Sequence, residues 1–122
     1  MRVIETIRRW RATAMPLSDQ LSVAGELAAG WADVLRLRTD DAWVHIESAH
    51  DRSRNAGLLH THAHLLRVVG WGLRRRPGAL VRELPLVVMA APAAHVRRAA
   101  GLGPDQEGGV GLLATWRMRA RG

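Results

Sequence analysis

The chain has 122 residues, which is enough for a single domain with one hydrophobic core, so a second independent domain is not expected. Its formal charge is +7, and all 18 of its basic residues are arginine. It has no cysteine, which excludes disulfides and thiolate metal sites and leaves nitrogen and oxygen atoms as the expected ligands of any metal.

The spacing of the apolar residues predicts an all-α protein. They recur at intervals of three and four, and the strand-favouring residues Tyr and Phe are absent. We therefore expect a single-domain bundle of about five helices, with a helical-hairpin core similar to a tetratricopeptide pair. The expected elements are an amphipathic helix at 2–14 within the N-terminal segment 1–16, helices at 18–38, 41–50, 58–74 and 79–100, and a Gly-rich loop with a basic tail at 101–122.

The last long helix contains Pro85 and Pro92. Each proline removes a backbone donor, so we expect the helix to bend or break there. The longest nearly apolar run, residues 84–94, is shorter than the roughly 17–25 residues that cross a bilayer. Residues 1–16 carry arginines and no continuous apolar stretch, so no secretory signal is expected. These features predict a cytoplasmic protein without a membrane partner.

The helix at 41–50 places an acid among apolar residues. At about 100° per residue, one side of this helix carries Trp43, Ile46, Glu47 and His50. His45 points the opposite way. An unpaired carboxylate on a buried stripe carries a desolvation penalty of several kcal/mol unless it meets a cation, a donor or a metal. Glu47 therefore indicates a partner on a neighbouring element.

The next helix, at 58–74, supplies that partner in the form of imidazoles. His60 and His64 are separated by four residues, so their side chains project from one face. Helices joined by a short connector pack antiparallel, which brings this pair against Glu47 and His50. We predict a metal site made of Glu47, His50, His60 and His64. Such ligands suit zinc, copper, nickel or iron, and the choice among these ions stays open.

The spacing also allows other roles for the same residues. His60 and His64 could be a solvent-facing pair, and Glu47 could be an ion-pair partner of Arg67 or Arg82. His50 alone could be a hydrogen-bonded core histidine. We expect structural roles for His45 and His62, and the role of His95 stays open. The tryptophans could either belong to the core or form the wall of a pocket, at Trp31, Trp43 and Trp71.

With three histidine ligands the metal would keep an open position. A metal in that setting acidifies a bound water, and Glu47 would be the catalytic general base beside His50, His60 and His64. Copper or iron would instead permit redox chemistry. The first hypothesis is therefore a metal-dependent enzyme that acts on a small molecule, with metal storage or metal sensing as its alternative.

The order of residues over 40–111 resembles a bacterial family of small helical proteins, domain-of-unknown-function family 3703. Its pattern is Ala-Trp-x-x-Leu-Glu-x-Ala-His, a His-x-x-x-His pair, an arginine-bearing helix end and a Gly-rich loop after a proline. The counterparts here are Ala42-Trp43, Ile46-Glu47, Ala49-His50, His60, His64, Arg74-Arg75-Arg76 and the loop 104–109. This chain has Arg82-Glu83 where the family has Gly-Gln, which marks a divergent member. The resemblance implies an α-helical bundle and no established activity.

Two further function classes follow from other parts of the chain. Residues 19–50 read as a helical hairpin, which favours a protein-interaction module without catalysis. The arginine clusters could bind nucleic acid, but they read more simply as solvated helix ends, and nucleic acid is the least favoured partner. The amphipathic helix at 2–14 and the proline-containing helix could both serve a homodimer.

Overall fold

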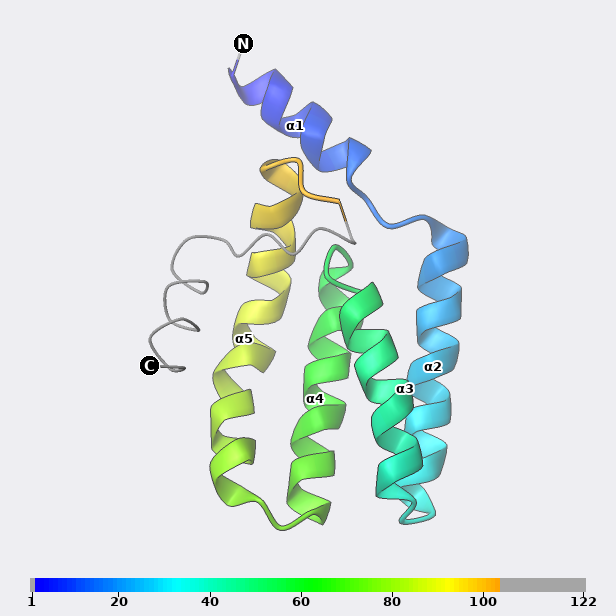
Figure 1. Ribbon diagram of the computed structural model, residues 1–122. Coiled ribbons are helices and arrows are strands. Elements are labelled where there is room, and N and C mark those ends of the chain that lie inside the picture. The colour runs from blue at the N-terminus through cyan, green and yellow to red at the C-terminus, as the bar shows by residue number, and fades with distance from the viewer. Residues whose placement is uncertain (1, 104–122) are drawn as a thin grey trace.

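The computed structural model describes residues 2–103, which form an all-α bundle and contain no strand (Figure 1). The five helices are α1 (Arg2–Ala12), α2 (Leu17–Leu35), α3 (Thr39–Arg52), α4 (Gly57–Leu73) and α5 (Pro77–Ala99). The all-α bundle of five helices predicted from the sequence is confirmed, and the predicted ends differ from the observed ones by up to three residues. The loop and tail predicted for 104–122 lie outside the described residues.

Helices α2 to α5 run side by side in an up-and-down order, and α1 lies across one end of the bundle (Figure 1). The connectors at 36–38, 53–56 and 74–76 are short, and short connectors force neighbouring helices to pack antiparallel. Helix α4 is central because it contacts α2, α3 and α5. Within residues 2–103, the helix that α1 contacts is α5.

The core lies between α2, α3 and α4, and close approach at two glycines brings these helices together. Ile46 and Leu66 are among the largest fully buried side chains. A Cβ added at Gly70 on α4 would lie 2.6 Å from the ring of Trp43 on α3, and one at Gly30 on α2 would lie 2.9 Å from Leu66. The absence of a side chain at Gly70 therefore fixes how closely α3 can approach α4.

Helices α2 and α4 end in the same unusual way. Leu37 and Arg75, just past these helices, have φ values of 58° and 54°, in the left-handed region where glycine is usual. Backbone N–H groups of residues 36–38 and 74–76 bond back to the last carbonyls of α2 and α4. These caps turn the chain sharply, which sets the antiparallel hairpins that build the bundle.

The single helix predicted at 79–100 is confirmed as α5, and of the two effects expected at Pro85 and Pro92, a bend or a break, the break does not occur. Each proline leaves the carbonyl four residues earlier without its backbone donor. Those carbonyls belong to Val81 and Val88, and both valines and both prolines are on the exposed side of α5. Water can satisfy carbonyls in that position, so the helix continues.

The length and composition of α5 would allow it to cross a membrane. One such helix is weak evidence for a membrane span, and only 17% of its apolar window is buried inside the protein. Its inner side packs against α4 and carries Glu83, which is 5% exposed. The predicted cytoplasmic location stays a prediction.

Candidate metal centre

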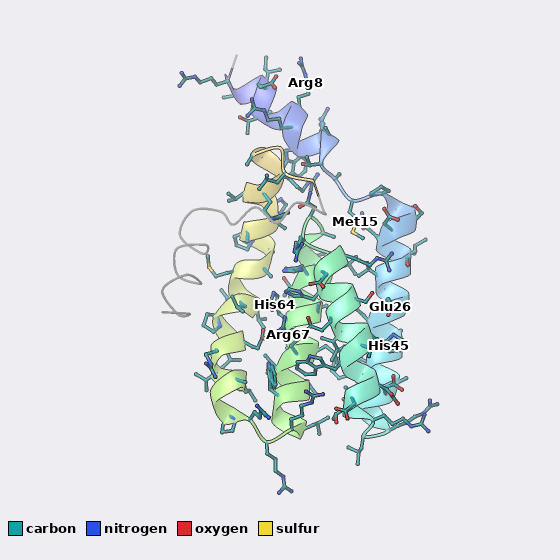
Figure 2. All side chains as sticks on the ribbon, in the orientation of Figure 1. Arg8, Met15, Glu26, His45, His64 and Arg67 are labelled. Atoms are coloured by element: carbon teal, nitrogen blue, oxygen red, sulfur yellow. The ribbon has the colours of Figure 1, made fainter. Side chains whose placement is uncertain are left out.

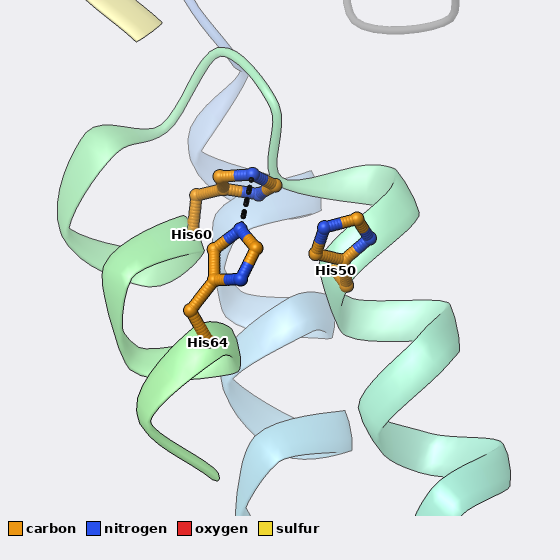
Figure 3. A group of neighbouring side chains, drawn as sticks. All are labelled: His50, His60 and His64. Atoms are coloured by element: carbon orange, nitrogen blue, oxygen red, sulfur yellow. Dashed lines mark hydrogen bonds between the residues drawn. The ribbon is translucent and has the colours of Figure 1, made fainter. Parts of the chain in front are cut away.

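Three imidazole rings converge where α3 gives way to α4. His50 comes from the last turn of α3, and His60 and His64 come from the first half of α4 (Figure 3). One ring nitrogen from each histidine lies within 4.8 Å of the other two. The Nε2 atoms of His60 and His64 are 3.2 Å apart. The structure therefore brings together the three histidines predicted as metal ligands.

The connector at 53–56 holds the two helices at this spacing. The Asn55 side chain is buried and donates to the backbone carbonyls of Thr13 and Leu102, at 2.9 and 2.8 Å. A Cβ added at Gly57 would lie 3.1 Å from the Ala91 backbone, so α5 closely approaches the start of α4. The connector is thus anchored to the chain before α2 and after α5.

Two of the three Nδ1 atoms face carboxylates. The Nδ1 atom of His50 is 3.0 Å from Oδ1 of Asp51, and that of His64 is 3.0 Å from Oε2 of Glu83. An ionised carboxylate can only accept a hydrogen bond, so each of these Nδ1 atoms is the donor and carries the proton. In the neutral ring the Nε2 atom then keeps its lone pair free.

The third Nδ1 atom faces a hydroxyl group. The fully buried Ser53 places its Oγ 3.0 Å from Nδ1 of His60 and donates to the His50 carbonyl at 3.3 Å. With the hydroxyl proton in that bond, the serine oxygen accepts from Nδ1 of His60, whereas a hydroxyl turned toward His60 donates to Nδ1. The direction of the Ser53 hydroxyl therefore sets the tautomer of His60, and the first direction leaves its Nε2 lone pair free.

The Nε2 atoms of His60 and His64 face each other. At 3.2 Å they form the hydrogen bond drawn in Figure 3 when His60 carries its proton on Nε2, and they present two facing lone pairs when both rings carry the proton on Nδ1. Ligand nitrogens at 2.0–2.1 Å from a tetrahedral metal are about 3.3 Å apart, which is close to this spacing. A cation between the rings would satisfy both lone pairs, and the third histidine, His50, is within reach of the same point.

Burial keeps the rings of His50 and His60 uncharged near neutral pH. It lowers the pKa of His60 to about 3, and the neighbouring histidines and Arg54 act in the same direction. Burial also lowers the pKa of His50 to about 4, assisted by His64 and Arg67 and opposed by the hydrogen bond to Asp51. Metal ligation requires neutral imidazole, so His50 and His60 need no deprotonation step at pH 7.

Glu83 belongs to the site and was missed from the sequence. Its Oε2 accepts from His64, and its Oε1 accepts from Trp71 Nε1 at 3.3 Å. Oε1 also lies 2.9 Å from Nε of Arg67, in an ion pair whose N–H direction does not complete a hydrogen bond. Burial alone would raise the pKa of Glu83, but these three neighbours lower it below its ordinary value. The available signal was that Glu83 is the single acid in α5.

Glu47 lies at the edge of the cluster. It forms a second group with His50 and Asp51 whose ligand atoms are within 4.8 Å of one another, separate from the three-histidine group. Its side chain is 41% exposed and lies 3.6 Å from Arg67, the ion pair that was one of the alternatives. The roles of Glu47 as metal ligand and general base stay predictions.

The other three histidines have partners on different helices. Figure 2 shows His45 of α3 beside Glu26 of α2, away from His64. The contacts are His45 Nδ1 to Glu26 at 2.6 Å with Asp33 3.6 Å from Nε2, Trp31 Nε1 to His62 Nε2 at 2.6 Å, and Trp10 Nε1 to His95 Nδ1 at 3.1 Å. Each of these contacts fastens one helix to another, which is a structural role.

The tryptophans pack within the bundle. Trp43 and Trp71 meet with ring centroids 4.4 Å apart, and Arg74 lies over the Trp43 ring at 4.4 Å. Trp31 packs against the buried core. Of these rings, Trp71 is joined to the histidine cluster, through Glu83. The tryptophans thus serve mainly as packing, one of the two roles expected for them.

In comparisons with known proteins, no family model, no curated protein and no solved structure matches this chain. The resemblance to domain-of-unknown-function family 3703 therefore stays a prediction. The function proposed below is supported by the geometry of the histidine cluster.

Proposed function

We propose that this protein binds one divalent transition metal ion through the Nε2 atoms of His50, His60 and His64, and that the bound metal makes it an enzyme acting on a small molecule. The observation that carries the proposal is the set of Nδ1 contacts. Nδ1 of each ring contacts Asp51, Ser53 or Glu83, and with the proton on Nδ1 each ring has an Nε2 lone pair available for a metal. Histidine ligands in metalloproteins are oriented by such contacts on the second ring nitrogen.

The type of ligand limits which metal ions can bind at this site. Three neutral imidazoles suit zinc, copper, nickel and iron, and disfavour magnesium and calcium, which take oxygen ligands. Three protein ligands also leave a fourth position for water or substrate, as in catalytic zinc sites. A metal bound here would lower the pKa of such a water toward neutrality.

Glu47 is the group placed to assist that water. It lies beside His50 at the exposed edge of the site, and Arg67 holds its carboxylate at 3.6 Å. A partly exposed carboxylate next to a ligand can accept a proton from metal-bound water and release it to solvent. In this role Glu47 is the general base and remains outside the ligand set.

Metal binding is tested with protein purified without a tag. Titration with Zn²⁺ in a calorimeter, followed by elemental analysis, is expected to give one equivalent bound. His60→Ala and His64→Ala each lose a ligand and should bind weakly. His95→Ala is the matched control, since His95 lies outside the cluster and should leave binding unchanged. Wild-type protein that binds no Zn²⁺, Cu²⁺, Ni²⁺ or Fe²⁺ after reconstitution would reject the proposal.

The burial of the ligands favours metal storage or sensing as the second candidate. His50 and His64 are 8% and 4% exposed, which restricts access of a substrate. The two candidates differ in the fourth position. With Co²⁺ bound, an open position gives a visible spectrum that changes on adding azide, whereas a closed storage site gives a spectrum that azide does not change.

A further inference from the structure

We infer that Glu83 is a positioning residue that sets the tautomer of His64 and so decides whether His64 can bind a metal. This inference rests on the proposed metal site. Glu83 lies on α5, which contributes no histidine to the cluster, and its carboxylate is 5% exposed. Its contact with His64, Oε2 to Nδ1 at 3.0 Å, joins two groups that are both buried.

The two carboxylate oxygens of Glu83 contact different groups. Oε1 accepts from Trp71 Nε1 at 3.3 Å and lies 2.9 Å from Nε of Arg67, in an ion pair. Within residues 2–103, Oε2 contacts Nδ1 of His64. A carboxylate has no proton to donate, so the His64 ring can meet Oε2 only as the Nδ1–H tautomer. That tautomer places the lone pair on Nε2, toward His60.

An amide at this position would reverse the tautomer. In Glu83→Gln, the carbonyl oxygen should stay toward Trp71 and Arg67, because an amide NH₂ placed there would oppose the indole N–H and the arginine cation. The NH₂ group is then directed at Nδ1 of His64, which must accept. The proton of the His64 ring moves to Nε2, the atom that would bind the metal. The change preserves size and shape and removes one ligand lone pair.

The site is therefore built from three helices. Helices α3 and α4 supply the imidazoles, and α5 supplies the group that orients one of them. Partners that orient a metal-binding histidine are worth about 10–100-fold in metal affinity. This predicts that the packing of α5 on α4 is a condition for metal binding, although α5 carries no ligand.

The test uses two measurements on the whole chain. Long-range ¹H–¹⁵N correlation spectra of metal-free protein labelled at histidine nitrogens report which ring nitrogen carries the proton. Wild type is expected to show His64 protonated at Nδ1, and Glu83→Gln to show it protonated at Nε2. Calorimetric titration with Zn²⁺ is expected to give an affinity about 10–100-fold lower for Glu83→Gln than for wild type.

Glu26→Gln is the matched control. Glu26 contacts the Nδ1 atom of His45 at 2.6 Å, in the same kind of carboxylate–imidazole contact but away from the cluster. This variant should leave the His64 tautomer and the Zn²⁺ affinity unchanged. Glu83→Asp retains the charge and should keep His64 in the Nδ1–H form, so it separates the tautomer effect from a loss of packing.

Two outcomes would overturn the inference. One is a His64 ring protonated at Nε2 in metal-free wild type or in Glu83→Asp, spectra that remain decisive if Glu83→Gln does not fold. The other is Glu83→Gln with wild-type tautomer and wild-type Zn²⁺ affinity. If wild type binds no metal at all, the proposed function fails, whereas the spectra of the metal-free protein still decide the role of Glu83.

Discussion

Each of the two sides of α3 carries a histidine, and the two histidines differ in how many of their ring nitrogens contact a carboxylate. Toward α2, both nitrogens of His45 face carboxylates, those of Glu26 and Asp33. Toward α4, His50 faces one carboxylate with Nδ1 and directs its other nitrogen at the cluster. A ring with both nitrogens engaged fastens helices together, whereas a ring with one free nitrogen can bind a metal.

The largest expected effect comes from removing these two histidines in turn. His50→Ala deletes a ligand and should reduce Zn²⁺ affinity by more than the roughly 10–100-fold expected for a residue that only orients a ligand. His45→Ala should bind Zn²⁺ as wild type does and lose stability instead, because Glu26 and Asp33 lose their shared partner. Calorimetric titration and urea unfolding of both variants measure the contrast. Equal loss of Zn²⁺ affinity in both would remove the distinction between the two sides.

The second largest effect is on stability at low pH. The pKa values of His50 and His60, about 4 and about 3, are below the ordinary value near 6.5 that applies in the unfolded chain. As the pH falls below 6.5, the unfolded state takes up protons first. The stabilisation is therefore complete above pH 6.5 and is lost as the pH falls toward the folded pKa values.

We expect the metal-free protein to lose on the order of a few kcal/mol of stability between pH 7.5 and pH 5. Urea unfolding at a series of pH values measures this loss. His60→Gln removes one of the two titrating rings and should flatten the profile. The lowered pKa of Glu83 acts in the same direction but at lower pH, because a carboxylate with a depressed pKa stabilises the fold only while it is ionised. A profile that rises as the pH falls would contradict the prediction.

A smaller effect tests the spacing between α3 and α4. Gly70→Ala places a Cβ 2.6 Å from the Trp43 ring, which forces the helices apart and should cost about 1–3 kcal/mol. The Zn²⁺ affinity should fall as well, because His50 moves away from the α4 ligands. Gly72→Ala is the control on the same helix, where the nearest atom is Leu80 Cδ1 at 3.6 Å. It should be neutral or stabilising.

The smallest effect is at the turn between α2 and α3. Leu37 has a φ of 58°, which costs a non-glycine residue about 1–2 kcal/mol, and its side chain is exposed. Leu37→Gly relieves this strain and should stabilise the protein by about 0.5–1 kcal/mol, with no change in Zn²⁺ affinity. Thermal unfolding with and without Zn²⁺ is the measurement. A changed affinity would show that the His45 side and the cluster are coupled through α3.

The sequence was sufficient for features that depend on spacing within one helix. The pairing of His60 with His64, and the opposite directions of His45 and His50, follow from 3.6 residues per turn. The antiparallel hairpin of α3 and α4 follows from a short connector. These local rules located the three imidazoles at one point.

Features that depend on contacts between distant elements were not accessible in this way. Glu83 is 19 residues from His64, and nothing in its own helix indicates that it faces that ring. The reason why Pro85 and Pro92 do not break α5 was also not accessible, because it depends on both prolines facing outward. The partial exposure of Glu47 results from its place at the edge of the α3–α4 interface, which periodicity alone does not give.

The hydrogen bond from Trp71 to Glu83 connects the fluorescence of Trp71 to the proposed metal site. The indole donates to the carboxylate that also accepts from His64, so Trp71 is two hydrogen bonds away from the point where an ion would sit. An ion that draws electron density from His64 strengthens the hydrogen bond from His64 to Glu83. The hydrogen bond from the Trp71 indole to the same carboxylate then becomes weaker. Copper entering the cluster should therefore quench Trp71 fluorescence, and Trp71→Phe should remove that share of the signal without any added dye.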